Sequence, residues 1–247
     1  MAENNFSLQK TLTMLLDEKK YHSLRDILST MNPADIAAIF DDLDQACLPL
    51  LFRLLPKELA AETFVEMEPE AQELLIRGFS DSELKEVIDE LYVDDAVDIV
   101  EEMPANVVQR ILTQAEPDMR KQINEILRYP EDSAGSIMTT EYVSLRPNMT
   151  VEEAILRIRR TGIDKETIYT CYVTRGHKLI GLTSVKDLLL CEDDDATIES
   201  IMQEHVITVS TLDDKEQVAQ MFSKYNFLAL PVVDTEDRLG GIVTFDD

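Results

Sequence analysis

The sequence predicts a chain of two halves, the first α-helical and the second α/β. Up to about residue 130, apolar residues recur with the period of short amphipathic helices, whereas short β-branched segments alternate with helices beyond that point. The α/β half also carries one signature twice. We therefore expect a superhelical stack of short helices at residues 1–130 and tandem repeated units at 131–195 and 196–247.

The helical half is divided by start signals that recur about every 12 residues. They are Pro33, Pro56, Pro69, Asp81, Asp94, Pro104 and Pro117. Proline is tolerated in the first turn of a helix, so each proline predicts a helix start. Asn32 and Ser80 stand directly before two of these signals and are expected N-caps. Helices of about three turns cannot bury an apolar stripe alone, so they must stack on one another.

The second half is predicted to alternate strands with helices. The expected strands are residues 143–145, 170–173, 179–182, 207–209, 230–233 and 239–243. Helices are expected at 151–160 and 215–224, capped by Thr150 and Asp214. Each unit then has the order β-α-β-β-α, except that the second lacks its closing helix.

The repeat is visible at fixed offsets. The segment 181–187, Gly-Leu-Thr-Ser-Val-Lys-Asp, recurs 60 positions later as Gly-Ile-Val-Thr-Phe-Asp-Asp at 241–247. Ile137-Met138 recurs 64 positions later as Ile201-Met202. Such offsets indicate a duplicated supersecondary unit. The first copy continues with three leucines and the second stops at Asp247, so we expect the sequence to be a piece of a longer protein.

Charge and composition exclude several classes of function. The 49 acidic and 23 basic residues give a formal net charge of −26. Nucleic acids and anionic membranes need clustered Lys and Arg, so neither is an expected partner, whereas cations are. The alternative is an acidic protein whose carboxylates simply face water. The three cysteines and three histidines are scattered, which argues against a disulfide framework or a zinc site.

Neither a membrane span nor an enzyme is expected. No apolar run approaches the ~18 residues of a spanning helix. The sequence has no Gly-rich phosphate loop and no Ser-His-Asp arrangement, and no pair of carboxylates stands out as acid and base. We therefore do not expect an enzyme.

Two features together resemble a known family. The Gly-x-x-Ser/Thr-x-x-Asp ending of both repeats resembles that of cystathionine-β-synthase (CBS) domains. An acidic helical half, followed by Tyr-Pro-Glu-Asp-Ser-Ala-Gly-Ser-Ile-Met-Thr at 129–139, resembles the cytosolic part of the MgtE magnesium transporters. The stretches 149–153, 166–169 and 230–234 fit the same pattern, and the likeness covers essentially the whole chain. The family often has a second glycine at Ser136 and an aspartate at Asn226.

The resemblance implies the fold, the partners and the function. It implies a helical N domain and a CBS pair, on the cytoplasmic side of the cell membrane, that sense Mg²⁺ and close a pore when Mg²⁺ is plentiful. The expected partners are a second copy bound through the CBS units and the transmembrane pore domain of the same chain. The alternative is an adenine-nucleotide-sensing CBS module attached to an enzyme or another channel.

Acidic residues of the helical half are the first candidate metal ligands. Asp94 and Asp98 are one turn apart on a helix, where like charges repel and a divalent cation would remove the repulsion. Alternatively, Asp94 and Asp95 merely favour a helix N-terminus. The resemblance to MgtE, whose helical domain contributes acidic ligands at a corresponding step, favours the metal-binding interpretation.

The end of the second repeat supplies the other candidates. Asp246 and Asp247 correspond to acidic residues that in MgtE face the helical domain across bound Mg²⁺, and Asn226 could add a carbonyl oxygen. One alternative is structural, because Thr244-x-x-Asp247 and Ser184-x-x-Asp187 are both capping-box patterns. The other follows from the resemblance, because the Asp of this motif contacts a ribose in nucleotide-binding CBS domains. Mg²⁺ keeps several waters and takes only one or two carboxylates, so it could bridge two domains loosely.

The resemblance also implies a nucleotide pocket in the CBS pair. Lys186 and Asp187 stand where some MgtE proteins contact the phosphates and ribose of ATP, and Phe227 where one lines the base pocket. Thr170 occupies a position where an aromatic stacking residue is expected. ATP or another adenine nucleotide is therefore the second expected ligand, beside Mg²⁺.

Overall fold

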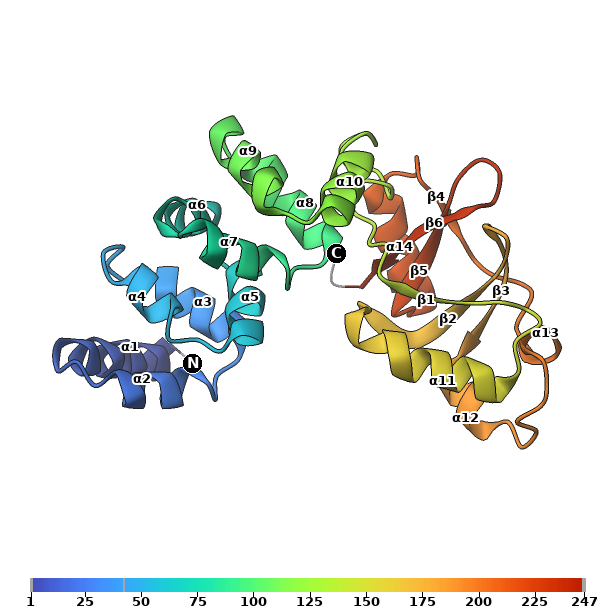
Figure 1. Cartoon of the computed structure of the whole chain (residues 1–247), viewed down its shortest axis with the longest axis horizontal. Helices are drawn as coiled ribbons and strands as arrows, with labels where there is room; N and C mark the ends of the chain where they lie inside the picture. The colour runs from blue at the N-terminus through green and yellow to red at the C-terminus, as the bar shows by residue number, and fades with distance from the viewer. Residues whose placement is uncertain (1, 42, 246–247) are drawn as a thin grey trace. The chain divides into compact units, whose positions relative to one another are not determined.

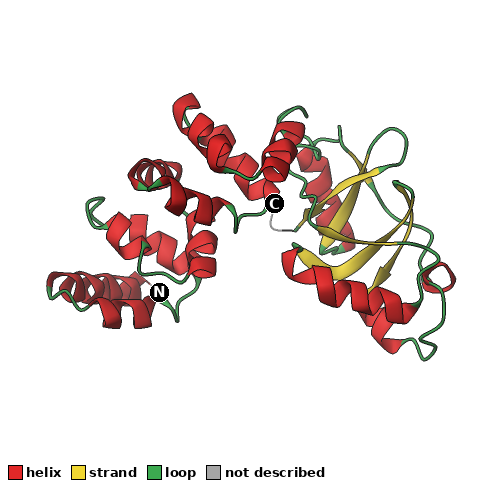
Figure 2. Ribbon diagram, in the orientation of Figure 1, coloured by secondary structure: helices red, strands yellow, loops and turns green. Residues whose placement is uncertain are grey.

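The computed structural model describes the backbone of residues 2–41 and 43–245, with side chains from residue 10 onward except at residue 164. The chain forms two compact units, shown in Figures 1 and 2. Unit 1 comprises residues 1–91 and 95–120, and unit 2 comprises residues 92–94 and 121–247. The expected fold class is confirmed, because a helical half is followed by a half in which strands alternate with helices.

The helical half contains α1 to α10. Their bounds are α1 Ala2–Asp17, α2 Tyr21–Leu28, α3 Pro33–Asp41, α4 Leu48–Phe52, α5 Lys57–Val65, α6 Pro69–Gly78, α7 Asp81–Ile88, α8 Val93–Glu102, α9 Ala105–Gln114 and α10 Pro117–Ile126. Each of the seven expected start signals lies at the first residue of a helix or directly beside it. The five-residue helix α4 is an addition, because its Leu-rich sequence is too short to show a helical period.

The expected caps are confirmed at the atomic level. Asn32 Oδ1 accepts a hydrogen bond of 3.1 Å from Ala34 N at the start of α3. Ser80 Oγ accepts from Glu83 N at 3.2 Å, and the Glu83 carboxylate accepts from Ser80 N at 2.7 Å. The second pair is a capping box, in which two donors without helical partners are satisfied reciprocally.

Alternate helices stack to build the core of unit 1. Helix α3 packs against α5, α5 against α7, and α7 against α9. Phe52 contributes to this core with its ring centroid 6.0 Å from that of Phe64 and 5.4 Å from that of Phe79. Full burial of side chains such as Phe40, Phe64 and Leu75 stabilises the fold by roughly 1.5–3 kcal/mol each.

Unit 2 contains two three-stranded sheets with the same topology. The strands are β1 Tyr142–Leu145, β2 Thr167–Arg175, β3 Lys178–Ser184, β4 Val209–Ser210, β5 Ala229–Val233 and β6 Leu239–Thr244. In each sheet the first strand is parallel to the second and the second antiparallel to the third, in the orders β1-β2-β3 and β4-β5-β6. Strand β4 begins two residues later than expected, at Val209, where pairing with Val232 starts.

Helices accompany both sheets, as expected. They are α11 Val151–Thr161, the 3-10 turn η1 Gly162–Asp164, α12 Val185–Leu190, α13 Ile198–Ile201 and α14 Lys215–Tyr225. Thr150 caps α11 in a capping box with Glu153, and Asp214 Oδ1 accepts from Glu216 N at 2.8 Å to cap α14. The one-turn helix α13 was not expected.

The two repeats interlock through their leading segments. Met138 and Ala134, which precede β1, are buried in the core of the second sheet, whereas Ile198, which precedes β4, is buried in the core of the first. The repeated glycines make room for this exchange. A Cβ atom on Gly241 would lie 2.5 Å from Thr139 O, and one on Gly181 would lie 2.6 Å from Met202 Sδ.

Candidate functional site

The acidic candidates of the helical half all lie on α8, but in different surroundings. Asp94 is 7% exposed, Asp95 is half-buried and Asp98 is exposed. Asp94 and Asp98 are one turn apart, as expected, yet only Asp98 presents its carboxylate to solvent. Asp94 belongs by its contacts to unit 2, whereas Asp95 and Asp98 belong to unit 1.

A carboxylate of unit 2 meets the first turn of α8. Glu141 Oε2 accepts hydrogen bonds from Val93 N at 3.3 Å and from Thr139 Oγ1 at 2.6 Å. A negative group at a helix N-terminus is favourable because the N-terminal amides carry partial positive charge. Residues 92–94 are thereby attached to the segment that leads into β1.

Asp95 and Asp98 line a cavity of about 370 Å³ in unit 1 together with two further carboxylates, Glu101 and Glu102. Gln72 lines the same cavity and donates from Nε2 to Phe64 O at 2.8 Å. No lysine or arginine is among the described lining residues, so the local potential favours cations.

Glu101 and Glu102 are not among the ligands predicted from the sequence, although their spacing from Asp98 carries a signal for them. Glu101 and Glu102 stand three and four positions after Asp98, the spacings that place side chains on one helical face. Within the described parts of the chain, no three His, Cys, Asp or Glu side chains form a group arranged to hold a metal ion. The carboxylates of α8 therefore offer a loosely arranged acidic surface, which suits an ion that keeps its waters.

The candidates at the end of the second repeat are only partly placed. Asp246 and Asp247 lie outside the described residues. Asn226 ends α14 in the left-handed conformation, with φ 54° and ψ 43°, and its N–H donates to Phe222 O at 2.8 Å. Asparagine tolerates this conformation better than most residues, which gives it a structural role at this position. Its side chain is exposed and can still offer an oxygen to a ligand.

Asp187 performs the structural role that its motif suggested. Its Oδ2 accepts from Ser184 Oγ at 2.6 Å and from Ser184 N at 3.4 Å, while its own N–H donates to Ser184 Oγ at 3.0 Å. These contacts form the capping box of α12. Lys186 is exposed in the same first turn, so its ammonium group is available to a ligand.

One aromatic side chain stacks on the other nucleotide candidate, Phe227. Phe227 is half-buried and stacks on Tyr225, with ring centroids 5.4 Å apart and an interplanar angle of 28°. Thr170, singled out for lacking an aromatic ring, is half-buried in β2. Its neighbour Tyr169 is 68% exposed and points to the opposite face of the strand, because successive side chains alternate.

None of the helices within residues 2–41 and 43–245 is both long enough and apolar enough to cross a membrane.

Comparison with known proteins matches both halves of the chain. Residues 31–132 match the MgtE intracellular N domain, and residues 134–192 and 198–247 match the CBS domain. The magnesium transporter MgtE of Thermus thermophilus is 38% identical over 245 residues, covering 97% of this chain and 54% of the relative. MgtE of Bacillus subtilis is 29% identical over 237 residues, covering 96% of this chain and 52% of the relative. The chain thus spans about half the length of these curated relatives.

Solved structures agree with these matches. A crystal structure of the cytosolic domain of the Mg²⁺ channel MgtE in complex with ATP has a TM-score of 0.90 at 37% identity, covering 96% of this chain and 97% of that chain. The soluble part of a magnesium transporter has a TM-score of 0.87 at 32% identity, covering 100% and 96%. These relatives are transporters, in agreement with the expectation that the chain is not an enzyme. The chain belongs to the MgtE family of magnesium transporters, of which it carries the intracellular N domain and the CBS pair.

Proposed function

We propose that this chain is the cytosolic Mg²⁺-sensing and gating region of an MgtE-type transporter in the cell membrane. In this proposal Mg²⁺ bridges the N domain and the CBS pair and so favours the closed state of the pore. The observation that carries the proposal is the acidic face of α8, where four carboxylates line one cavity without a basic residue among the described lining. Membership of the MgtE family supports it.

The chemistry of the ligands fits a sensor. Carboxylates on one helical face repel each other, and a divalent ion beside them removes that repulsion. Mg²⁺ dehydrates reluctantly and is held by few carboxylates, so its binding is weak enough to follow changes in concentration. We assign Asp95 and Asp98, which line the cavity, to the N-domain side of the bridge. Asp94, one turn before Asp98 on the same helix, is assigned as a third ligand. Asp246, Asp247 and Asn226 are assigned to the CBS side.

The assembly follows from the same proposal. The parent transporter is a homodimer, held together on this side by its CBS units and in the membrane by the pore domain of the same chain. A symmetric pore requires a two-fold arrangement of the regions that gate it. The alternative of a nucleotide-sensing CBS module on an enzyme or another channel leaves the match of residues 31–132 to the MgtE N domain without an explanation.

Small-angle scattering tests the proposal directly. The radius of gyration of the chain should fall when millimolar Mg²⁺ replaces chelator at constant ionic strength, because each bridging ion turns interdomain repulsion into attraction. The double variant Asp95→Asn, Asp98→Asn should need more Mg²⁺ for the same compaction. Asp118→Asn, an exposed position in the first turn of α10, is the matched control. An unchanged radius of gyration in Mg²⁺ would refute the sensor.

A second ligand is proposed because a structurally similar MgtE domain is in complex with ATP. We assign the phosphates to Lys186, the ribose to Asp187 and the base to Phe227. The capping box uses Oδ2 of Asp187, and no hydrogen bond that the structure describes uses Oδ1. The affinity for ATP should therefore fall in Lys186→Gln and in Phe227→Ala but not in the control Lys121→Gln, whose side chain is exposed on α10. Equal affinities in all three would refute the assignment.

A further inference from the structure

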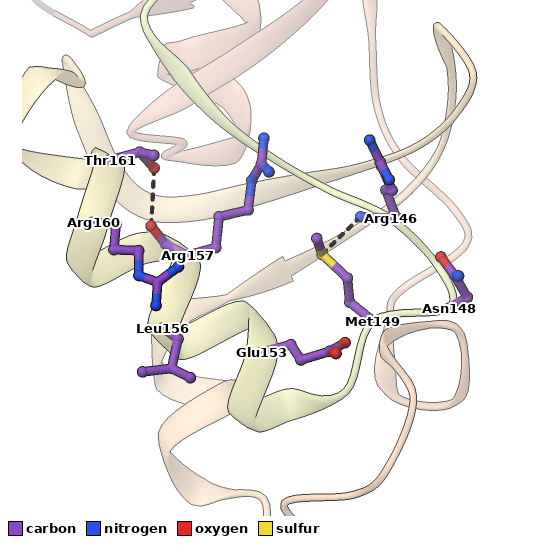
Figure 3. A pocket seen from close by; sticks show the side chains of 8 residues that line it. All are labelled: Arg146, Asn148, Met149, Glu153, Leu156, Arg157, Arg160 and Thr161. Carbon is purple, nitrogen blue, oxygen red and sulfur yellow. Dashed lines mark hydrogen bonds between the residues drawn. The ribbon is translucent and has the colours of Figure 1, made fainter.

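A cavity on the first repeat gathers positive charge in a strongly acidic chain. Arg146, directly after β1, and Arg157 and Arg160, on α11, line a surface cavity of about 590 Å³ (Figure 3). Figure 3 shows the Arg157 side chain extended away from α11 toward the side from which Arg146 projects. The cavity lies wholly within unit 2.

These three guanidinium groups have no carboxylate partner among the described residues. Five other arginines, Arg53, Arg77, Arg110, Arg175 and Arg238, each pair with an Asp or Glu. Arg25, Arg128 and Arg159 also have no carboxylate partner among the described residues, but none of them lines this cavity, so the cavity is distinguished by the convergence of three such groups. The sequence has 49 acidic and 23 basic residues, so a shortage of acidic residues does not explain why these three arginines lack a carboxylate partner. Arg157 and Arg160 are also three positions apart on one helix, where like charges repel.

The acidic residue of the cavity is already engaged. Glu153 belongs to the capping box of α11, where its Oε2 accepts from Thr150 N at 3.0 Å. Its place is therefore set by the helix start. The charge balance of the cavity is three positive groups against one negative group, which leaves a net attraction for anions.

We propose that this cavity binds a compact polyanion carrying two or more phosphate groups. Guanidinium groups match phosphate oxygens with paired hydrogen bonds and remain charged at all physiological pH values. No aromatic ring is among the described residues that line the cavity, so it recognises phosphate and not a nucleobase. The site is thus separate from the nucleotide pocket assigned to Lys186, Asp187 and Phe227.

Phosphate groups could come from a free metabolite or from the headgroup of an acidic lipid. The formal net charge of −26 repels both sources, but a bilayer faces a much larger part of the acidic surface than a small ligand within one cavity does, which favours the free ligand. Inorganic pyrophosphate is the probe for the first source. Vesicles containing phosphatidic acid in a neutral phosphatidylcholine background are the probe for the second.

Calorimetric titration of the whole chain with pyrophosphate tests the proposal. Chelator is present throughout, so the result does not depend on the Mg²⁺ sensor. The double variant Arg157→Gln, Arg160→Gln should weaken binding at least tenfold. Arg159→Gln is the matched control, because Arg159 is exposed on the same helix but does not line the cavity. Wild-type binding should weaken as salt rises.

Three results would overturn the proposal. The first is the absence of pyrophosphate binding at low salt in the wild-type chain. The second is equal loss of affinity in the double variant and in Arg159→Gln, which would indicate a diffuse charge effect. The third is a wild-type chain that does not bind pyrophosphate, combined with a double variant whose sedimentation coefficient differs from that of the wild type. That result would make this face a contact between subunits. Vesicle binding that depends on Arg157 and Arg160 would support the phosphate site and identify a lipid source.

Discussion

Thr139 and Ile242 exchange two backbone hydrogen bonds, of 2.8 Å and 2.9 Å, although 103 positions separate them in the sequence. Gln203 and Leu182 exchange an equivalent pair, of 2.8 Å and 3.0 Å. The segment before β1 is thus joined to the last strand of the second repeat, and the segment before β4 to the last strand of the first. The two repeats are therefore expected to unfold together rather than one at a time.

Gly241 should be the most sensitive point of this junction. In Gly241→Ala the new Cβ would lie 2.5 Å from Thr139 O, which is backbone and cannot move aside cheaply. We expect a loss of about 1–3 kcal/mol in the free energy of unfolding, measured by urea denaturation. Gly240→Ala is the control, because the nearest atom to its Cβ is at 3.6 Å. Equal stability of both variants would contradict the interlocked arrangement.

Replacing either of two buried threonines by valine should change the stability of the fold, but in opposite directions. Thr183 Oγ1 is buried and has no hydrogen-bond partner among the described residues, and the second repeat has Val243 at the equivalent position. Thr183→Val should therefore keep or raise stability, by up to about 1 kcal/mol. Thr139→Val removes the donor to Glu141 and should cost about 1–3 kcal/mol. Thermal denaturation of the two variants side by side checks this, and destabilisation by Thr183→Val would count against it.

The Arg53–Glu83 pair should make stability depend on pH in the acid range. The side-chain hydrogen bond from Arg53, aided by the amide of Ser80, lowers the pKa of Glu83 from 4.5 to about 2. A lowered folded-state pKa stabilises the fold above pH 4.5, and this contribution is lost as the pH falls toward 2.

Glu83→Gln measures that contribution. The pair is partly exposed to solvent, so the substitution should cost only about 1 kcal/mol at pH 7, including the weakened cap. The difference from wild type should shrink as the pH is lowered from 5 toward 2, since protonated Glu83 has already lost the charge. Denaturant-induced unfolding of both proteins at several pH values between 5 and 2 measures this difference in the free energy of unfolding. A stability difference between Glu83→Gln and the wild-type chain that stays constant with pH would show that the lost stability depends on the shape of the side chain and not on its charge.

Asp247 and Asp187 occupy equivalent positions in the repeat and form a matched pair for the proposed Mg²⁺ bridge. Asp187→Asn weakens the capping box of α12, so it should lower the melting temperature and leave the Mg²⁺ midpoint of protease protection unchanged. Asp247→Asn should raise the Mg²⁺ midpoint, because it removes a proposed ligand charge. A lower melting temperature with an unmoved midpoint for Asp247→Asn would assign that residue to capping alone.

Local rules predicted much of the fold from the sequence. Prolines and N-caps mark the helix starts because each satisfies or removes backbone donors within one turn, a constraint that neighbouring residues already reveal. The rules failed where structure depends on distant partners. Strand β4 is displaced because its pairing with β5 decides where it begins, and α13 forms where Ile198 is buried in the core of the other repeat.

The candidate site was less predictable because one residue type serves two purposes. An aspartate in a helical first turn can cap, as Asp187 does, or bind a cation, and both uses need the same carboxylate in the same place. Glu101 and Glu102 could have been found by extending the helical spacing beyond Asp98. The burial of Asp94 could not, because it depends on contacts within unit 2 that sequence spacing does not encode.

The alternate stacking of α3, α5, α7 and α9 has a consequence for biosynthesis. Each helix in this series packs on the one that left the ribosome two helices earlier, so the core of unit 1 can grow as the polypeptide emerges. Every contact in that series joins helices that are close together in the sequence, so none of them requires residues that are synthesised much later. The N domain can thus be in place before the interlocked repeats are complete, which shortens the time for which its apolar surfaces are accessible to chaperones.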